Sequence, residues 1–344
     1  MKYVTRLVYV LVPWLIVPPA WPLPMCHVDK LELRGTPGSV KTRSELSAVA
    51  VRGRYLLVLS NAAIGPVDNY HALQVFERAG KKVFRWVRDE IIYEAADDGC
   101  ADADFEAMAL DGNHLYVVGS HSSVHKKLNA DTSYKHNRGI LTNFERLTCA
   151  GRDMLFEYKI DAKARIELPP RQINLRRLIA DSKLLSAFSE LPSKENGLDI
   201  EGLAVSASRL YVGFRGPVLR DNLVPVLRMS LSDEEESELL FVKLGGRGIR
   251  DMVAVSDGFV IVGGPAGDQE MPFEIYHWDG KDMVVGHDRP AGGTITPLCA
   301  LPSEDDGKPE GIAIVSRSGN AMEAIIVYDG NKRLIAKRAS IPLK

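Results

Sequence analysis

The sequence has little cysteine and no excess of charge of either sign. Its four cysteines form no CxxC motif, which excludes a zinc ribbon and a thioredoxin-type redox site. The 43 Lys and Arg residues stand against 45 Asp and Glu, which argues against non-specific binding to nucleic acid. A GxSxG elbow, an HExxH helix and a P-loop are also absent. The serine hydrolase, zincin and nucleotide-triphosphatase classes therefore have no motif to support them.

Long apolar runs are absent except at the N-terminus. Lys2 and Arg6 precede an uncharged stretch from Leu7 to Met25, whose five prolines argue against a stable spanning helix. We interpret residues 1–24 as a secretory signal peptide, with a retained anchor as the alternative. Residues 25–344 then form a single domain that is exported to the periplasm or secreted, with no stable membrane span after cleavage.

Export places the cysteines in an oxidising compartment, where disulfides form. Sequence alone leaves all pairings open, and we expect Cys100 to pair with Cys149 because these two flank one repeat unit. Cys26 precedes the predicted fold, in a segment without the small residues of a lipoprotein box. Lipidation of Cys26 is therefore not expected.

Five segments repeat one pattern, in which an acidic or polar residue begins a short strand that contains a small residue and an alanine. These segments are Ser47–Val51, Glu106–Leu110, Glu201–Val205, Asp251–Val255 and Glu310–Ile314. A second apolar strand follows each after a short polar loop, namely Tyr55–Leu59, His114–Val118, Arg209–Gly213, Phe259–Gly263 and Ala324–Tyr328. The pattern predicts five hairpins.

The pattern recurs after 59, 95, 50 and 59 residues, which is the period of a β-propeller blade. The predicted fold class is therefore all-β, a propeller of five blades, with six as the alternative. In the long interval, apolar residues at helical spacing predict an inserted helix around 172–189, within an insertion of about 169–196. The alternative is that this long interval contains a sixth blade that has lost the pattern. Pairing of Val28–Leu33 with Arg333–Ile341 would close the ring.

The repeats carry a resemblance to a known family. The phrases DFEAMAL, DIEGLAV, IRDMVAV and KPEGIAI resemble the bacterial domain-of-unknown-function family 3616, over the chain from Leu33 to Ile341. That family is itself similar to the phytase-like propellers. The resemblance implies a propeller and no established activity. The chain departs from the acidic pattern at Ser47.

One end of the ring is predicted to gather the polar residues. In an antiparallel hairpin the start of the first strand and the end of the second lie at the same end. The first-strand starts supply Glu45, Asp104, Glu106, Asp199, Glu201, Asp251 and Glu310. The second-strand ends supply Asn61, Ser120, His121, Ser122, Arg215 and Asp268, and Arg250 and Lys308 add positive charge. The topology thus predicts one acidic and basic site on the axis.

We assign roles by residue type. The candidate catalytic residues are Glu106, Glu201 and His121, which suit acid and base chemistry. The candidate ligand-binding residues are Arg215, Asn61, Ser120, Arg250 and Asp268. The candidate metal ligands are Asp104, Glu106, Asp199, Glu201, Asp251 and Glu310, because clustered carboxylates must be neutralised and hard oxygen ligands suit calcium. The alternative is structural: the carboxylates accept hydrogen bonds from backbone amides of neighbouring blades and tie the ring together.

These assignments lead to more than one function. We favour an exported propeller whose axial site binds a small or polymeric anionic ligand or substrate, with calcium-assisted hydrolysis of an ester or phosphoester as its enzymatic form. The alternative is a non-catalytic platform for a protein partner. The basic stretch His125–Arg138 is interpreted as a solvated loop, and the acidic run Asp233–Glu238 as a solvated hairpin tip.

Overall fold

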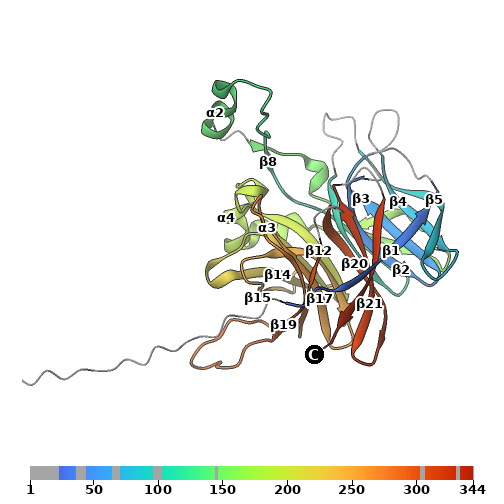
Figure 1. Ribbon diagram of the computed structural model, residues 1–344. Coiled ribbons are helices and arrows are strands. Elements are labelled where there is room, and N and C mark those ends of the chain that lie inside the picture. Colours follow the sequence, from blue (N-terminus) through green and yellow to red (C-terminus); the bar gives the residue numbers. More distant parts are fainter. Residues whose placement is uncertain are drawn as a thin grey trace, which may run out of the picture.

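The computed structural model describes residues 23–35, 44–63, 70–95, 103–143, 146–302, 307–330 and 334–343. Within these residues the chain is almost entirely β-structure and folds as a β-propeller (Figure 1). Residues 1–22 of the predicted signal peptide lie outside the described residues. No helix in the described ranges has the length and apolar character needed to cross a membrane.

Hydrogen bonding groups the described strands into five antiparallel sets of four. The first set is β2 (Leu46–Arg52), β3 (Tyr55–Ser60), β4 (Tyr70–Arg78) and β5 (Val83–Glu94). The second is β6 (Phe105–Asp111), β7 (His114–Gly119), β10 (Leu155–Ile160) and β11 (Ile166–Gln172). The third is β12 (Asp199–Ser206), β13 (Arg209–Gly216), β14 (Leu223–Ser230) and β15 (Ser237–Lys243). All five predicted hairpins are present, each as the first two strands of a set.

The remaining two sets complete the ring. The fourth is β16 (Gly248–Val255), β17 (Gly258–Gly264), β18 (Phe273–Trp278) and β19 (Ile295–Leu301). The fifth is β20 (Lys308–Ser318), β21 (Ala321–Asp329), β22 (Ile335–Pro342) and the N-terminal strand β1 (His27–Arg34). A separate two-stranded ribbon pairs β8 (Val124–His125) with β9 (Arg146–Leu147).

The first strands of the five sets contact one another in a closed ring. β2 contacts β6, β6 contacts β12, β12 contacts β16, β16 contacts β20, and β20 contacts β2 again. A hydrophobic cluster lies between each adjacent pair of sets. Each sheet is therefore covered on both faces, so Val117 packs into one cluster and its neighbour Val118 into the next. This double burial explains why the second strands are continuous apolar runs.

The predicted ring closure is confirmed. β1 pairs antiparallel with β22, with His27 opposite Ser340. The second half of β1 continues parallel to β5, with Glu32 opposite Val83. One strand thus joins the first and fifth sets into a single eight-stranded sheet.

The placement of Cys26 before the fold is wrong. Cys26 is buried, forms a disulfide with Cys299 of β19, and donates its amide hydrogen to the carbonyl oxygen of Ala300 at 2.8 Å. The chain before β1 runs along the edge of β19, which the strand pattern did not reveal. Cys149 is also disulfide-bonded, and its expected partner Cys100 lies outside the described residues.

The inserted helix is divided into two short helices, α3 (Leu175–Asp181) and α4 (Lys183–Ser189). Ser182 separates them with an extended backbone, and it caps both. Its amide donates to the carbonyl of Leu178, and its hydroxyl accepts from the amide of Leu185. The prolines at 169 and 170 lie in β11, an edge strand, where a missing N–H costs no ladder bond.

Two charged segments differ from their predicted form. The basic stretch His125–Arg138 is not a plain loop, because its end forms the start of helix α2 (Tyr134–Asn143), which buries no residue and lies apart from the ring (Figure 1). The acidic run is not simply solvated either. Four of its glutamates pair with arginines, in the pairs Arg171–Glu234, Arg177–Glu235, Arg209–Glu236 and Arg228–Glu238.

Candidate axial site

Every first strand carries a β-bulge at the same point, and each bulge leaves one residue out of the strand pairing. In β12 this residue is Glu201, between Ile200 opposite Phe214 and Gly202 opposite Gly213. The full set is Ser47, Glu106, Glu201, Arg250 and Glu310. Bulges re-aim a side chain, and here they place one polar residue from each set at the same end of the ring.

The repeat pattern predicts Asp251 at the bulge position of the fourth set. The structure places the preceding residue, Arg250, there instead. Arg250 is the residue that the β16 bulge leaves unpaired, whereas Asp251 pairs opposite Val262. The Asp251 carboxylate accepts the backbone amides of Met252 at 2.7 Å and Ile312 of β20 at 2.6 Å. Asp251 therefore ties two neighbouring sheets together, which is the structural role weighed above. Burial raises its pKa well above the ordinary value.

Arg215, at the end of β13, holds two carboxylates of β12. Its Nη1 lies 2.6 Å from Glu201 Oε1, and its Nη2 lies 2.6 Å from Asp199 Oδ2. The Nη2 group also donates to Ser193 Oγ at 3.0 Å. The carboxylate side chains are only 5% and 4% exposed, so these are buried ion pairs.

Arg250 extends this network to the next two sets. Its Nε lies 2.9 Å from Glu201 Oε2 and 2.8 Å from Glu310 Oε2, and its Nη2 donates to Glu310 Oε1. The fork of a guanidinium matches a carboxylate in this way. Three buried carboxylates and two arginines therefore alternate along one chain of contacts: Asp199, Arg215, Glu201, Arg250 and Glu310.

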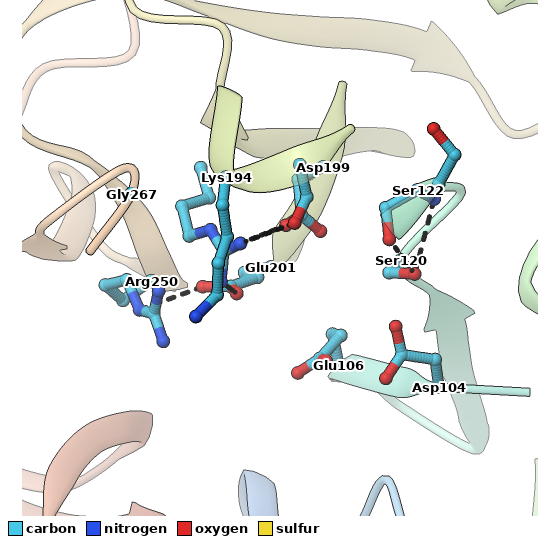
Figure 2. A network of polar contacts seen from close by, with 12 residues as sticks. Asp104, Glu106, Ser120, Ser122, Lys194, Asp199, Glu201, Arg250 and Gly267 are labelled. Atoms are coloured by element: carbon cyan, nitrogen blue, oxygen red, sulfur yellow. Dashed lines mark hydrogen bonds and ion pairs between the residues drawn. The ribbon is translucent and has the colours of Figure 1, made fainter. Parts of the chain in front are cut away.

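Glu106 is the bulge carboxylate that no arginine or lysine contacts within the described residues. Its hydrogen-bond donor is Asn61, whose Nδ2 lies 3.4 Å from Glu106 Oε1. Glu106, on β6, is half-buried and lies beside Asp104, which precedes β6, and across from Glu201 (Figure 2). Burial raises the pKa of Glu106 well above its usual range, and the carboxylates of Asp104 and Glu201 raise it further. Glu106 therefore keeps its proton to a higher pH than an ordinary glutamic acid.

Two further carboxyl groups titrate near neutrality. Burial raises the pKa of Asp199 to about 7, against the lowering effect of Arg215. Burial likewise raises the pKa of Glu310 to about 8, against the lowering effect of Arg250. The axial end can therefore take up protons in the neutral range, where isolated carboxyl groups are fully ionised.

Asp104 and Ser120 are joined to the site through Arg152. The Nη1 group of Arg152 lies 3.2 Å from Asp104 Oδ2 and 3.2 Å from Ser122 Oγ. The hydroxyl oxygens of Ser120 and Ser122 are 2.9 Å apart (Figure 2). This group lies on the β6–β7 side of the axis, together with Glu106.

Among the described residues, the side chains of two predicted site residues, His121 and Asp268, form no hydrogen bond or ion pair with this network. His121 is buried with a positive φ of 52°, and its Nδ1 lies 2.9 Å from the carbonyl oxygen of Gly119. Burial lowers the pKa of His121, and the nearby charges that modulate it are those of Asp153 and Arg176. Asp268 is exposed at the rim, where it pairs with Lys194.

Sequence reasoning missed three residues of the site. Asp329 is the last residue of the second strand β21, so the rule that selected Asn61 and Arg215 would have found it. Burial raises the pKa of Asp329, while Arg250 lowers it. Arg152 and Ser193 lie on the short 3-10 helices η1 (Ala150–Arg152) and η2 (Ser193–Glu195), which no strand rule reaches.

The structure leaves the calcium prediction untested. Among the described residues, no three or more His, Cys, Asp or Glu side chains form a group that could hold a metal ion. Asp199, Glu201 and Glu310 already give their oxygens to arginines. A calcium ion at these positions would have to displace those guanidinium groups.

Below the bulges the axis is apolar. A cavity of about 190 Å³ is lined by residues from all five first strands, among them Val49, Met108, Leu203, Met252 and Ile312. The charged residues of the bulges therefore lie at one end of this apolar cavity. Any polar ligand of this site must bind at that end.

The family of the chain follows from its sequence. A sequence model described as "Protein of unknown function (DUF3616)" matches residues 45–340. The chain belongs to the DUF3616 family. This confirms the family resemblance carried by the repeats, while the further similarity to the phytase-like propellers stays a prediction. No curated protein matches the sequence.

Solved structures match this chain at low identity and with TM-scores below 0.5. An exo-β-1,3-galactanase from Phanerochaete chrysosporium has 8% identity and a TM-score of 0.45, and the match covers 93% of this chain and 64% of the galactanase. A hypothetical protein from Leishmania major has 14% identity and a TM-score of 0.41, covering 91% and 88%. The Malassezia sympodialis allergen Mala s 1 has 10% identity and a TM-score of 0.39, covering 86% and 77%. The chain thus spans less than two thirds of the galactanase, and we draw no functional argument from these structures.

Proposed function

We propose that this protein is an exported β-propeller whose axial end binds the anionic group of a small ligand, a carboxylate or a phosphate, together with a proton. One observation carries the proposal. Glu106 is a half-buried carboxyl group with a raised pKa, and it lies among carboxylates that are paired with arginines.

The proton on Glu106 is what makes an anionic ligand compatible with this site. An anion that approaches ionised Glu106 is repelled, because Asp104 and Glu201 already contribute negative charge. A protonated Glu106 removes one negative charge and supplies an O–H donor. The Asn61 amide and the Ser120 hydroxyl add further hydrogen-bonding groups on the same side of the axis.

The direction of the pH dependence separates this proposal from its opposite. An anionic ligand binds more tightly at low pH, because its binding requires the proton on Glu106. A cationic ligand would bind more tightly at high pH, because it pairs with the ionised carboxylate. The test is calorimetric titration with sulfate and with succinate. Between pH 6.5 and 8.5 the charge of each anion changes by no more than about a tenth of a unit, so the ligand itself contributes little to the pH dependence.

We expect tighter binding at pH 6.5 than at pH 8.5, with proton uptake measured in two buffers of different ionisation enthalpy. Glu106→Gln keeps a hydrogen-bond donor and does not titrate, so it should reduce the pH dependence to the part that Asp199 and Glu310 contribute. The matched control is Glu167→Gln, an exposed glutamate of β11. Binding that strengthens with pH, or no binding of either anion by the wild-type protein, would overturn the proposal. Calcium chloride and EDTA are added in parallel titrations to test the calcium prediction.

The same proton supports hydrolysis of an ester or phosphoester as a second candidate. A general acid works best with a pKa near the working pH, and burial raises the pKa of Glu106 in that direction from its ordinary acidic value. Water would add to the carbonyl carbon or phosphorus and release its proton to solvent, while Glu106 protonates the departing oxygen. Turnover of p-nitrophenyl acetate or p-nitrophenyl phosphate that is lost in Glu106→Gln and kept in Glu167→Gln would support this activity. Anion binding without turnover would restrict the protein to binding.

A further inference from the structure

A groove of about 1020 Å³ lies between the fourth and fifth sets of strands. Its inner end is at Lys308, the first residue of β20, which is an inner strand of the ring. Its outer end is at Met25, which forms a bridge to Ala300 of the outermost strand β19. The groove therefore extends from the axial end toward the outside of the ring.

The walls of the groove are mostly apolar. One wall is the loop 265–272 between β17 and β18, which contributes Met271 and two prolines. The facing wall contains Leu301 and Met25, and Met25 is 60% exposed although it is a large apolar side chain. The neighbouring disulfide from Cys26 to β19 holds Met25 in this place. Methionine side chains adapt their shape to apolar ligands.

The inner end of the groove carries positive charge. Lys308 is exposed, and among the described residues it makes no ion pair. Lys308 lies opposite Asp329 in the pairing of β20 with β21, and its positive charge acts to lower the pKa of Asp329. Lys308 is therefore close to the axial site. Of the two acidic residues that line the groove, Asp268 is paired with Lys194 and Glu270 lies on the outer loop.

We propose that this groove binds the apolar tail of the ligand whose anionic group occupies the axial site. The ligand class is then an aliphatic carboxylate, or an acyl compound that yields one. The inference rests on the proposed function for its anionic head. It adds a separate claim, which is that affinity grows with the length of the aliphatic chain because methylene groups leave water for the groove.

The test uses acetate, butanoate, hexanoate and octanoate at pH 6.5. We expect the affinity to rise with each methylene group, by up to about fourfold per group if it is fully buried. With ¹³C-methyl methionine, octanoate should shift the methyl signal of Met271, and acetate should not. Met271→Gln should remove the gain with chain length, whereas Met283→Gln, at a half-buried methionine outside the groove, should keep it.

The role of Lys308 is tested with a neutral chain of equal length. Octanoate should bind more tightly than 1-octanol, and Lys308→Ala should reduce this difference while the control Lys243→Ala leaves it unchanged. Equal affinities of acetate and octanoate, with no shift at Met271, would overturn the groove proposal and leave anion binding at the axis intact. Octanoate binding that shifts the Met271 signal but is unchanged in Glu106→Gln at every pH would support the groove and contradict the axial proton.

Discussion

Arg250 occupies in β16 the position that Glu201 occupies in β12, and the two side chains bind each other. Each is the residue that a bulge leaves unpaired, and Arg250 Nε lies 2.9 Å from Glu201 Oε2. A position that is acidic in three of the five first strands is thus basic in one. Because Arg250 also binds Glu310, it shares the compensation of Glu201 with Arg215 and is the arginine that compensates buried Glu310.

Replacement of Arg250 should destabilise the protein strongly. Arg250→Met leaves Glu201 with one guanidinium and Glu310 with none, and breaking a buried pair in this way costs about 3–5 kcal/mol. The measurement is urea denaturation at pH 7. The control is Arg317→Met, because Arg317 pairs with Asp257 at the surface and its loss should cost less than about 1 kcal/mol. Equal effects of both substitutions would contradict the buried network.

The free energy of unfolding should fall as the pH rises from about 4 to about 8. Asp199, Glu310 and Glu106 have raised pKa values in the folded state, so the folded protein binds more protons than the unfolded chain in this range. Each such proton contributes a slope of about 1.4 kcal/mol per pH unit. Glu106→Gln should reduce the slope and stabilise the protein at pH 8 relative to wild type, whereas Glu167→Gln should do neither. A slope unchanged in Glu106→Gln would show that Glu106 has an ordinary pKa.

Asp251 should matter for stability and not for ligand binding. Asp251→Ala leaves the amides of Met252 and Ile312 without an acceptor, at a cost of about 2–4 kcal/mol. Asp251→Asn keeps one acceptor oxygen and should lose less. Thermal unfolding and sulfate titration of both variants, with the exposed Asp288→Ala as control, check this. Loss of anion binding in a stably folded Asp251→Asn would instead place Asp251 in the site.

The disulfide between Cys26 and Cys299 should stabilise the closed ring. It links residues that are 273 positions apart, and loss of a native disulfide typically costs about 2–5 kcal/mol. The double variant Cys26→Ser, Cys299→Ser should therefore unfold at a lower temperature. Amide hydrogen exchange should accelerate in β1 more than in β13, which lies in the third set. Uniform acceleration in both strands would contradict a local role at the ring closure.

The hairpins and the ring closure were predictable because they depend on burial. Each second strand is covered on both faces, so its apolar run is long and easy to recognise. The unpaired edge next to β22 required a partner, and Val28–Leu33 was the available strand. The inner-strand carboxylates and arginines were also predicted to share one end, because hairpin geometry alone places them there.

The register of the fourth repeat was not predictable from the pattern. The repeats align on an alanine, but the hairpin pairing makes Val253, and not Ala254, the counterpart of Ala204. The packing at that position accepts a valine, so the alanine of the repeat pattern does not identify the position in the fourth repeat. The orientation of the His121 side chain was not predictable either, because it depends on the positive φ of His121, which lies in a loop.

β1 is the first described strand of the chain, and it lies between strands from opposite ends of the described sequence. Its two hydrogen-bonded neighbours are β5 of the first set and β22, the last described strand. The seam between the first and fifth sets therefore depends on both ends of the described chain. Loss of β1 or of β22, at opposite ends of the sequence, would open the same seam.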